Sequence, residues 1–95
     1  MVMELDRPVS EEVEDIDTDT KFGNKVVLYN DEVHTFEQVT TQVMLAIGCS
    51  EEEGFKIAYM VDRTGSAIVY QGEMGECLRV SSILQDIQLH TEITT

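Results

Sequence analysis

Two successive helix-start signals in the middle of the sequence constrain the fold more than any other feature. Thr35 stands three residues before Gln38, and Ser50 stands three residues before Glu53. This spacing is typical of a capping box, in which the two residues bond each other's free backbone N–H groups. Each signal is followed by apolar residues at helical spacing and then by a glycine, which ends helices readily because it adopts the left-handed conformation. The predicted helices are residues 36–47 and, after the Ser50 cap, residues 51 to about 63.

Short apolar runs on either side of these helices predict strands. Residues 25–29, "KVVLY", are β-branched and apolar and stop at an Asn-Asp pair, which favours turns. Residues 66–71, "SAIVYQ", and residues 89–94, "LHTEIT", are two further strand candidates, and residues 73–87, "EMGECLRVSSILQDI", have the apolar spacing of a helix. The order β-α-α-β-α-β predicts an α+β domain in which the helices pack on one three-stranded sheet. The positions predicted to face inward are Phe36, Val39, Val43, Ala46, Ile47, Cys77, Val80, Ile83, Leu84, Ile87, Leu89, Thr91 and Ile93.

Acidic residues dominate the charge of the chain. Asp and Glu number 19 against 6 Lys and Arg, a formal net charge of -13. This charge opposes binding to phosphate backbones and anionic lipids, because both require cationic side chains. We therefore expect neither nucleic acid nor membrane among the partners, and a cationic ligand or a basic protein surface becomes more plausible. Surplus acid also keeps a protein soluble without any partner, and composition alone leaves that explanation open.

The N-terminal segment differs from the rest of the chain in composition. Its first 20 residues carry eight carboxylates and one base, Arg7, and they include the only proline, Pro8. A segment of low hydrophobicity and high charge buries too little apolar surface to offset the entropy of ordering. We therefore expect residues 1–24 to be a flexible acidic tail and residues 25–95 to form one domain. No apolar run is long enough to cross a bilayer or to act as a signal peptide, so a cytoplasmic location is expected.

Few residues of the chain are suited to catalysis or metal binding. Cys49 and Cys77 lack a CxxC spacing and a histidine cluster, so we expect buried or half-buried thiols rather than metal ligands or a disulfide. His34 and His90 are the only histidines. His34 could act as a base oriented by one of the acids just before it, but no third catalytic element accompanies such a pair. We expect a protein without enzymatic activity, metal or cofactor.

A turn of three polar residues, Asn30, Asp31 and Glu32, follows the first predicted strand. An ammonium group has three donors and no acceptor, so a site for it needs several converging oxygens, with a carboxylate for charge and an amide for geometry. These residues meet that requirement without long, flexible side chains. Asn and Asp also end strands in proteins without such sites, and Glu32 would then be solvated. The residues by themselves leave both interpretations open.

Several blocks of sequence, in order, resemble the ClpS family of adaptors. They are "VVLYNDEVHTFEQV", "GFKIAYMVDRTG", "AIVY" and "LHTEI". The same blocks are similar to the ClpS-like region of eukaryotic N-recognin ubiquitin ligases. The resemblance covers about residues 25–93 and agrees with the β-α-α-β-α-β order. The family's proteins deliver N-degron substrates to a AAA+ Clp protease.

The resemblance implies a site and the residues that form it. In the family, the Asn-Asp-Asp/Glu turn holds the free α-amino group of the substrate. The bulky first side chain, Leu, Phe, Tyr or Trp, enters a pocket between the helices. The implied acceptors of the α-amino group in this chain are Asn30 and Glu32, with Asp31 in a supporting role and Asp62 as a further acceptor. The implied pocket residues are His34, Phe36, Ala58, Val61 and Leu89.

Some of these positions depart from the bacterial pattern. Phe36 stands where methionine is common, and His34 stands where threonine is common. Ala58 replaces a methionine of the pocket wall. Asp62 takes the place of a histidine that helps to hold the α-amino group in bacterial adaptors. The "VDR" motif of the ligase-type relatives also has Asp at this position. Phe36 and Val61 fit the core stripes of their helices equally well, which leaves a purely structural role open for both.

The resemblance also implies a docking surface for an unfoldase. ClpS proteins dock on the N-terminal domain of ClpA or ClpC through the region of the second strand and third helix. Leu78 stands where that helix often has a lysine, with Arg79 beside it. The implied docking residues are Tyr70, Glu73, Glu76, Leu78 and Arg79.

Two functions are consistent with this resemblance. The first is an adaptor that binds N-degron substrates through their free α-amino group and bulky hydrophobic first residue and delivers them to a ClpA- or ClpC-type AAA+ unfoldase-protease. The departures at Ala58, Asp62 and Leu78 motivate the alternative. That alternative is a ClpS-fold regulatory module that docks on an unfoldase or another protein without N-degron recognition.

Overall fold

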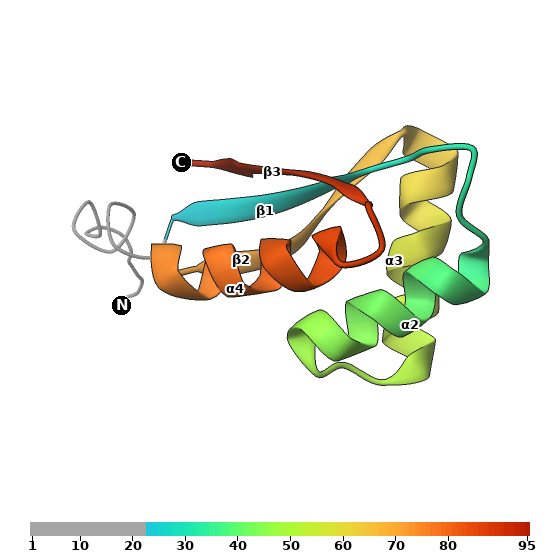
Figure 1. Cartoon of the computed structure of the whole chain (residues 1–95), viewed down its shortest axis with the longest axis horizontal. Helices are drawn as coiled ribbons and strands as arrows, with labels where there is room; N and C mark the ends of the chain where they lie inside the picture. The colour runs from blue at the N-terminus through green and yellow to red at the C-terminus, as the bar shows by residue number, and fades with distance from the viewer. Residues whose placement is uncertain (1–22) are drawn as a thin grey trace, which may run out of the picture.

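The computed structural model describes residues 23–95 and contains three helices and three strands in the predicted order (Figure 1). The three helices pack on a three-stranded antiparallel sheet, which confirms the predicted α+β fold. The predicted tail, residues 1–24, lies almost wholly outside the described residues, and Asn24 already belongs to the first strand. The elements are β1 (Asn24–Tyr29), α2 (Phe36–Ile47), α3 (Glu51–Thr64), β2 (Ser66–Gly72), α4 (Met74–Gln85) and β3 (His90–Thr94).

β1 is the central strand of the sheet. The strand order is β2-β1-β3, and both pairings are antiparallel. The register pairs Tyr29 with Ser66 of β2 and with His90 of β3. The pairing with β2 shifts between Val26 and Val27, which marks a β-bulge. Because β1 ends where both neighbours begin, the turn after it lies close to the end of α3 and to the connection between α4 and β3.

The core lies between the sheet and the helices. Leu28 of β1, Val43 of α2, and Val80 and Leu84 of α4 are fully buried. In Figure 1, α4 runs alongside the sheet, whereas α2 and α3 pack together beyond one end of it. A single core shared by α2 and α4 therefore explains the apolar spacing predicted for each of these helices.

Both cysteines have the environment that the sequence predicts. Cys77 is buried, Cys49 is half-buried, and neither forms a disulfide. Burial raises the pKa of the Cys49 thiol, and the nearby Glu53 carboxylate adds to this shift. The thiolate form, which is the reactive one, is therefore disfavoured.

Both predicted helix starts are present, one of them in full. Thr35 Oγ1 accepts a bond from the Gln38 N–H at 3.0 Å, and the Thr35 N–H donates to Gln38 Oε1 at 2.9 Å. Ser50 Oγ accepts from the Glu53 N–H at 3.1 Å, and only this half of the second capping box is formed. The capping box predicted at Thr35 is confirmed, and the one at Ser50 is confirmed in part.

The two helices approach closely where α3 has a glycine. A Cβ atom at Gly54 would lie 3.1 Å from the Thr40 carbonyl oxygen and 3.2 Å from Met44 Cγ. These distances are shorter than ordinary van der Waals contacts, so the helices could not pack at this separation with a larger residue. Gly54 thus sets the spacing between α2 and α3.

The last predicted helix is shorter than its apolar pattern. It ends at Gln85 instead of residue 87, and residues 86–88 form a turn. Gln88 has a φ of 63° in this turn, a left-handed conformation that breaks the helix. The carbonyl of Ile87 is therefore released from helical hydrogen bonding and becomes available to another segment.

Two classes of site are absent from the described part of the chain. Within residues 23–95, no helix is long and apolar enough to cross a membrane. The same residues contain no group of three His, Cys, Asp or Glu side chains placed to hold a metal ion.

Candidate functional site

A cavity of about 240 Å³ opens where the end of β1 meets α2, α3 and the start of β3. It includes eight of the nine residues that the family resemblance implies for the α-amino site and the pocket. Glu32 is the ninth, and it is exposed to solvent outside the cavity lining. The lining residues are Leu28, Tyr29, Asn30, Asp31, His34, Thr35, Phe36, Val39, Ala58, Val61, Asp62 and Leu89.

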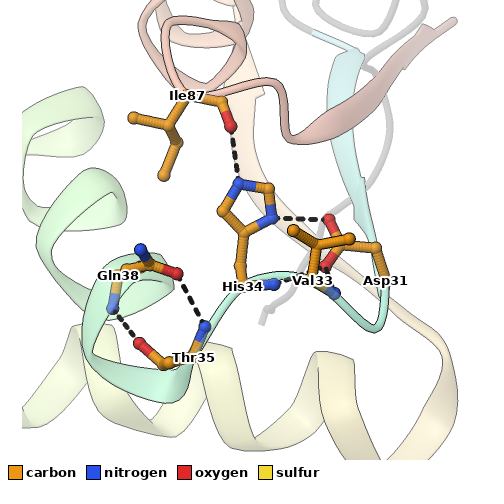
Figure 2. Close-up of polar contacts among 6 residues, drawn as sticks. All are labelled: Asp31, Val33, His34, Thr35, Gln38 and Ile87. Atoms are coloured by element: carbon orange, nitrogen blue, oxygen red, sulfur yellow. Dashed lines mark hydrogen bonds and ion pairs between the residues drawn. The ribbon is translucent and has the colours of Figure 1, made fainter.

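The turn after β1 is organised by the carboxylate of Asp31 (Figure 2). Asp31 Oδ1 accepts hydrogen bonds from the backbone N–H groups of Val33 at 2.9 Å and His34 at 3.0 Å. Asp31 Oδ2 contacts His34 Nδ1 at 2.7 Å. The arrangement is an Asx turn, in which the side chain replaces a backbone acceptor. Both oxygens of Asp31 are therefore engaged within the turn.

His34 connects this turn to the end of α4. Figure 2 shows its ring between Asp31 and the carbonyl of Ile87, with one nitrogen directed at each. A carboxylate and a carbonyl oxygen can only accept, so both hydrogen bonds form together when each ring nitrogen carries a proton, in the imidazolium form. The side chain retains only 10% of its exposed area. The bridge thus fixes the turn against the segment that carries Ile87.

The pKa values of the bridging pair are shifted in opposite directions. The hydrogen bond to Asp31 raises the pKa of His34, partial burial opposes this effect, and the bond to the Ile87 carbonyl adds to it. Burial alone would raise the pKa of Asp31, but the hydrogen bonds from the His34 and Val33 N–H groups and from the His34 ring lower it overall. Both shifts favour the charged forms, so each residue stabilises the other as a member of an ion pair.

The bridge predicts a pH dependence of the free energy of unfolding. The folded pKa of His34 is above its unfolded value, so its contribution is fully present below about pH 6.5 and is lost as the pH rises through the folded pKa. The folded pKa of Asp31 is below its unfolded value, so its contribution is present above about pH 4 and is lost as the pH falls through the folded pKa. The ion pair therefore stabilises the fold most between about pH 4 and pH 6.5.

Urea unfolding of the wild type and a His34→Ala variant tests this dependence. We expect the difference in free energy of unfolding to be larger at about pH 5.5 than at about pH 9. Asp31→Asn should reduce the same pH dependence, because it removes the carboxylate that raises the pKa of His34. An equal difference in free energy of unfolding at both pH values would show that the His34–Asp31 ion pair does not stabilise the fold.

The end of α3 is held beside the turn by the backbone. The Asn30 N–H donates to the carbonyl of Gly65 at 2.9 Å, and the Gly65 N–H donates to the carbonyl of Val61 at 2.8 Å. Gly65 has a φ of 94°, so glycine is the residue best suited to this helix end. These two bonds place the last turn of α3, which contains Asp62, on the same cavity as Asn30.

The apolar wall of the cavity comes from three elements. Ala58 and Val61 of α3 and Leu89 before β3 are buried, with 3%, 4% and 4% of their area exposed. Phe36, at the start of α2, is 40% exposed, and its ring centroid lies 5.6 Å from that of Phe55. The apolar spacing predicted an inward position for Phe36, but the structure places its ring at the cavity and partly in solvent.

The charges in the lining are not equivalent. Asp31 and His34 compensate each other, whereas Asp62 forms no ion pair with any residue in the range 23–95. The neighbouring Arg63 is directed elsewhere, because its guanidinium bonds to the hydroxyl of Tyr59 and lies 5.4 Å from the centroid of that ring. Asp62 is therefore the carboxylate of the cavity that remains available to a cation.

Sequence reasoning did not assign four lining residues to the site: Leu28, Tyr29, Thr35 and Val39. Tyr29 ends β1 and its hydroxyl donates to Glu92 at 2.6 Å. Thr35 is also the predicted helix cap and Val39 a predicted inward residue, and the structure confirms both roles. Residues of this kind carry no separate signal in the sequence, because their place in the lining depends on where the elements meet.

The residues assigned to unfoldase docking lie away from the cavity. They are at the end of β2 and the start of α4, and β2 ends beside Asn24, at the opposite end of β1 from the cavity. Leu78 is 57% exposed, and Arg79 bonds to Glu76 at 2.9 Å. An exposed pair of this kind contributes little to stability.

Comparisons with known proteins relate this chain to adaptors and to parts of larger ligases. The family model described as "ATP-dependent Clp protease adaptor protein ClpS" matches residues 20–92. Among curated proteins, the chain is similar to the E3 ubiquitin-protein ligase UBR2 of Homo sapiens, at 38% identity over 58 residues. It is also similar to the E3 ubiquitin-protein ligase ubr-1 of Caenorhabditis elegans, at 37% identity over 59 residues. These matches cover 61% and 62% of this chain but 3% of each ligase, so the chain spans a small part of their length.

A solved structure gives a similar result over most of the chain. The structure of Agrobacterium tumefaciens ClpS2 bound to L-phenylalaninamide matches with a TM-score of 0.68 and 26% sequence identity. The match covers 78% of this chain and 98% of the ClpS2 chain.

Proposed function

Because this chain belongs to the ClpS family of ATP-dependent Clp protease adaptors, we propose that it is an adaptor for N-degron substrates. It would bind the free α-amino group and the bulky hydrophobic first residue of a substrate protein. It would then deliver that substrate to a AAA+ Clp unfoldase-protease of the ClpA or ClpC type. The chain itself would catalyse no reaction.

The observation that carries this proposal is the combination of groups around one cavity. Apolar side chains, Ala58, Val61 and Leu89, form one part of its lining, and Asn30 and Asp62 provide oxygen acceptors in the same lining. A protein N-terminus with a large apolar first residue presents an ammonium group directly beside an apolar side chain. The cavity therefore offers complementary groups for both parts of such a residue.

The size of the cavity is suitable for an aromatic side chain. An apolar cavity of about 150 Å³ accommodates benzene, and this cavity measures about 240 Å³. The small Ala58 leaves room in the wall, and Phe36 offers an aromatic face at the margin. The departures from the bacterial pattern at these two positions thus leave an open cavity.

Electrostatics favours an ammonium ion at this site. Since His34 neutralises Asp31, Asp62 supplies the uncompensated negative charge. Asn30 adds an amide oxygen, and the ammonium can donate three hydrogen bonds. Asp62 would replace the histidine of bacterial adaptors with a group that attracts the cation more strongly. Asp31 would mainly fix the conformation of the turn and would contribute less to binding of the ammonium group.

The relative with a bound ligand supports the same chemistry. L-phenylalaninamide, bound to Agrobacterium tumefaciens ClpS2, has a free α-amino group and an aromatic side chain on the same carbon. Burying such a side chain contributes about 1.5–3 kcal/mol, and a hydrogen bond to a charged group about 1.5–3 kcal/mol. After the cost of association is subtracted, micromolar binding is expected.

Delivery to an unfoldase requires a second surface that stays free while substrate is bound. The assigned docking residues, among them the exposed Leu78 and Arg79, lie at the opposite end of β1 from the cavity. One adaptor could therefore contact substrate and unfoldase together. The E3 ligase relatives share only a short region with this chain, so a ligase activity is not part of the proposal.

A degradation assay tests the delivery step. A folded fluorescent protein with a free N-terminal Phe would be incubated with a ClpA- or ClpC-type unfoldase and its peptidase, with and without this chain. We expect the chain to accelerate loss of fluorescence with one of the two unfoldases, and a substrate that begins with Val to be unaffected. Intact peptide binding with no acceleration by either unfoldase would refute delivery but leave the binding site standing.

The regulatory alternative makes a different prediction in the same assay. A ClpS-fold module without N-degron recognition would bind the unfoldase and change its activity equally for substrates that begin with Phe and with Val. That result, together with absence of peptide binding, would favour the alternative.

A further inference from the structure

A second groove lies between α2 and α3 and has a volume of about 690 Å³. Its lining includes Glu37 and Met44 of α2 and Glu51, Glu52 and Phe55 of α3. We call it the helical groove. Its lining shares no residue with the cavity at the end of β1, and the two adjoin where Phe55 of the groove contacts Phe36 of the cavity.

The helical groove continues into an exposed apolar surface on α3. Phe55 is 50% exposed, and Tyr59 and Met60, which line an adjoining hollow with it, are 47% and 52% exposed. Aromatic residues dominate binding energy in protein interfaces, and methionine adapts its shape to different partners. Phe36 contacts Phe55 and Arg63 lies over the ring of Tyr59, but about half of the area of each of these three side chains stays exposed.

The charge around the helical groove indicates what kind of partner it fits. Three carboxylates, Glu37, Glu51 and Glu52, line it against one cation, Lys56. A second copy of this chain carries the same net charge of -13, and its approach would be opposed by like charges. The chain's own N-terminal segment is opposed for the same reason, with eight carboxylates in its first 20 residues. The acidic lining therefore favours a partner protein with basic residues.

We propose that the helical groove binds an amphipathic segment of a partner protein that carries Lys or Arg beside apolar residues. Such a segment places its apolar side into a groove between two helices. Its lining runs from Glu37 to Met44 in α2 and from Glu51 to Lys56 in α3, so at 1.5 Å per residue the groove is roughly 10 Å long, enough for about two helical turns. The apolar side would contact Phe55 and Met44, and the basic side would face the three glutamates.

A pair of matched peptides tests this proposal on the full chain. The sequence of residues 8–19, "PVSEEVEDID" followed by "TD", has Val9, Val13 and Ile16 at helical spacing among six acids. One probe is this peptide, N-acetylated so that it has no free α-amino group. The other is its twin with every Asp and Glu replaced by Lys. We expect the lysine twin to bind at least about tenfold more tightly in fluorescence anisotropy, with an affinity that falls as salt is added.

Two variants assign that binding to the helical groove. Glu51→Lys combined with Glu52→Lys should weaken binding of the lysine twin about tenfold or more, and Phe55→Ser should do the same without a change of charge. Glu92→Lys, an exposed position on β3 outside the groove lining, is a charge-reversal control and should have little effect. Circular dichroism checks that each variant is folded, and Phe55→Ser decides the outcome if the double charge reversal is not.

The same peptides and variants also give the results that would contradict a basic occupant of the helical groove. Absence of binding by the lysine twin, or binding unchanged by both groove variants, would contradict it. Tighter binding of the natural acidic peptide would make the chain's own leader the occupant, and a dimer in sedimentation that Phe55→Ser dissociates would make a second copy the occupant. Saturating L-phenylalaninamide should leave the lysine twin bound, so this inference and the proposed N-degron site can fail independently.

Discussion

Replacing Asp62 with alanine is expected to weaken binding of L-phenylalaninamide about ten- to a hundredfold. The physical reason is that Asp62 is the carboxylate of the cavity that no other residue in the range 23–95 neutralises. A hydrogen bond to a charged group contributes about 1.5–3 kcal/mol, and 1.4 kcal/mol corresponds to about a factor of ten in affinity. Calorimetric titration of both proteins measures this change.

Two further variants separate charge from shape and position. Asp62→Asn retains an oxygen acceptor without the charge, so its loss should be smaller than that of Asp62→Ala. Glu73→Ala removes an exposed carboxylate at the opposite end of β1 and should leave the affinity within about twofold, because the charge is screened over that distance. Equal affinities for wild type and Asp62→Ala would show that Asp62 does not hold the ammonium group.

Replacing Leu84 with alanine is expected to lower the free energy of unfolding by about 2–5 kcal/mol. Leu84 has no exposed area, and it lies in the core between α4 and the sheet. Its truncation removes apolar contacts and leaves a cavity that neighbours fill only in part. Small domains have total stabilities near the low end of about 5–15 kcal/mol, so this variant should unfold at a much lower urea concentration.

Leu78→Ala is the matched control for that measurement. It makes the same chemical change on the same helix, but Leu78 is 57% exposed. Its effect on the free energy of unfolding should stay within about 0.5 kcal/mol. Similar unfolding midpoints for the two variants would contradict the position of the core.

The fold could be predicted from local signals because those signals are complete within a few residues. The capping pair Thr35 and Gln38 specifies where α2 begins, and Gly65 specifies where α3 ends. The apolar spacing of α4, however, predicted a helix to residue 87. The apolar pattern does not encode the left-handed conformation of Gln88, which ends the helical region early.

The site could be predicted only through the resemblance, and its internal connections could not. The residues alone left Asn30 and Asp31 as either a simple turn or an ammonium site. The bond from His34 to the Ile87 carbonyl joins two segments far apart in the sequence, and a backbone acceptor has no sequence signature. The structure therefore engages Asp31 in the turn and points Glu32 to solvent, which changes which acids are available to a ligand.

The most direct test of the account is a titration of the full chain with L-phenylalaninamide and, in parallel, with N-acetyl-L-phenylalaninamide, followed by amide chemical shifts. Acetylation removes the positive charge and two donors but keeps the aromatic side chain, so it isolates the role of the ammonium group. We predict micromolar binding of the free amine, with shifts centred on Asn30, Val61 and Asp62, and no measurable binding of the acetylated compound. Equal binding of both compounds, or shifts that avoid these residues, would contradict the proposal that this cavity holds a protein N-terminus.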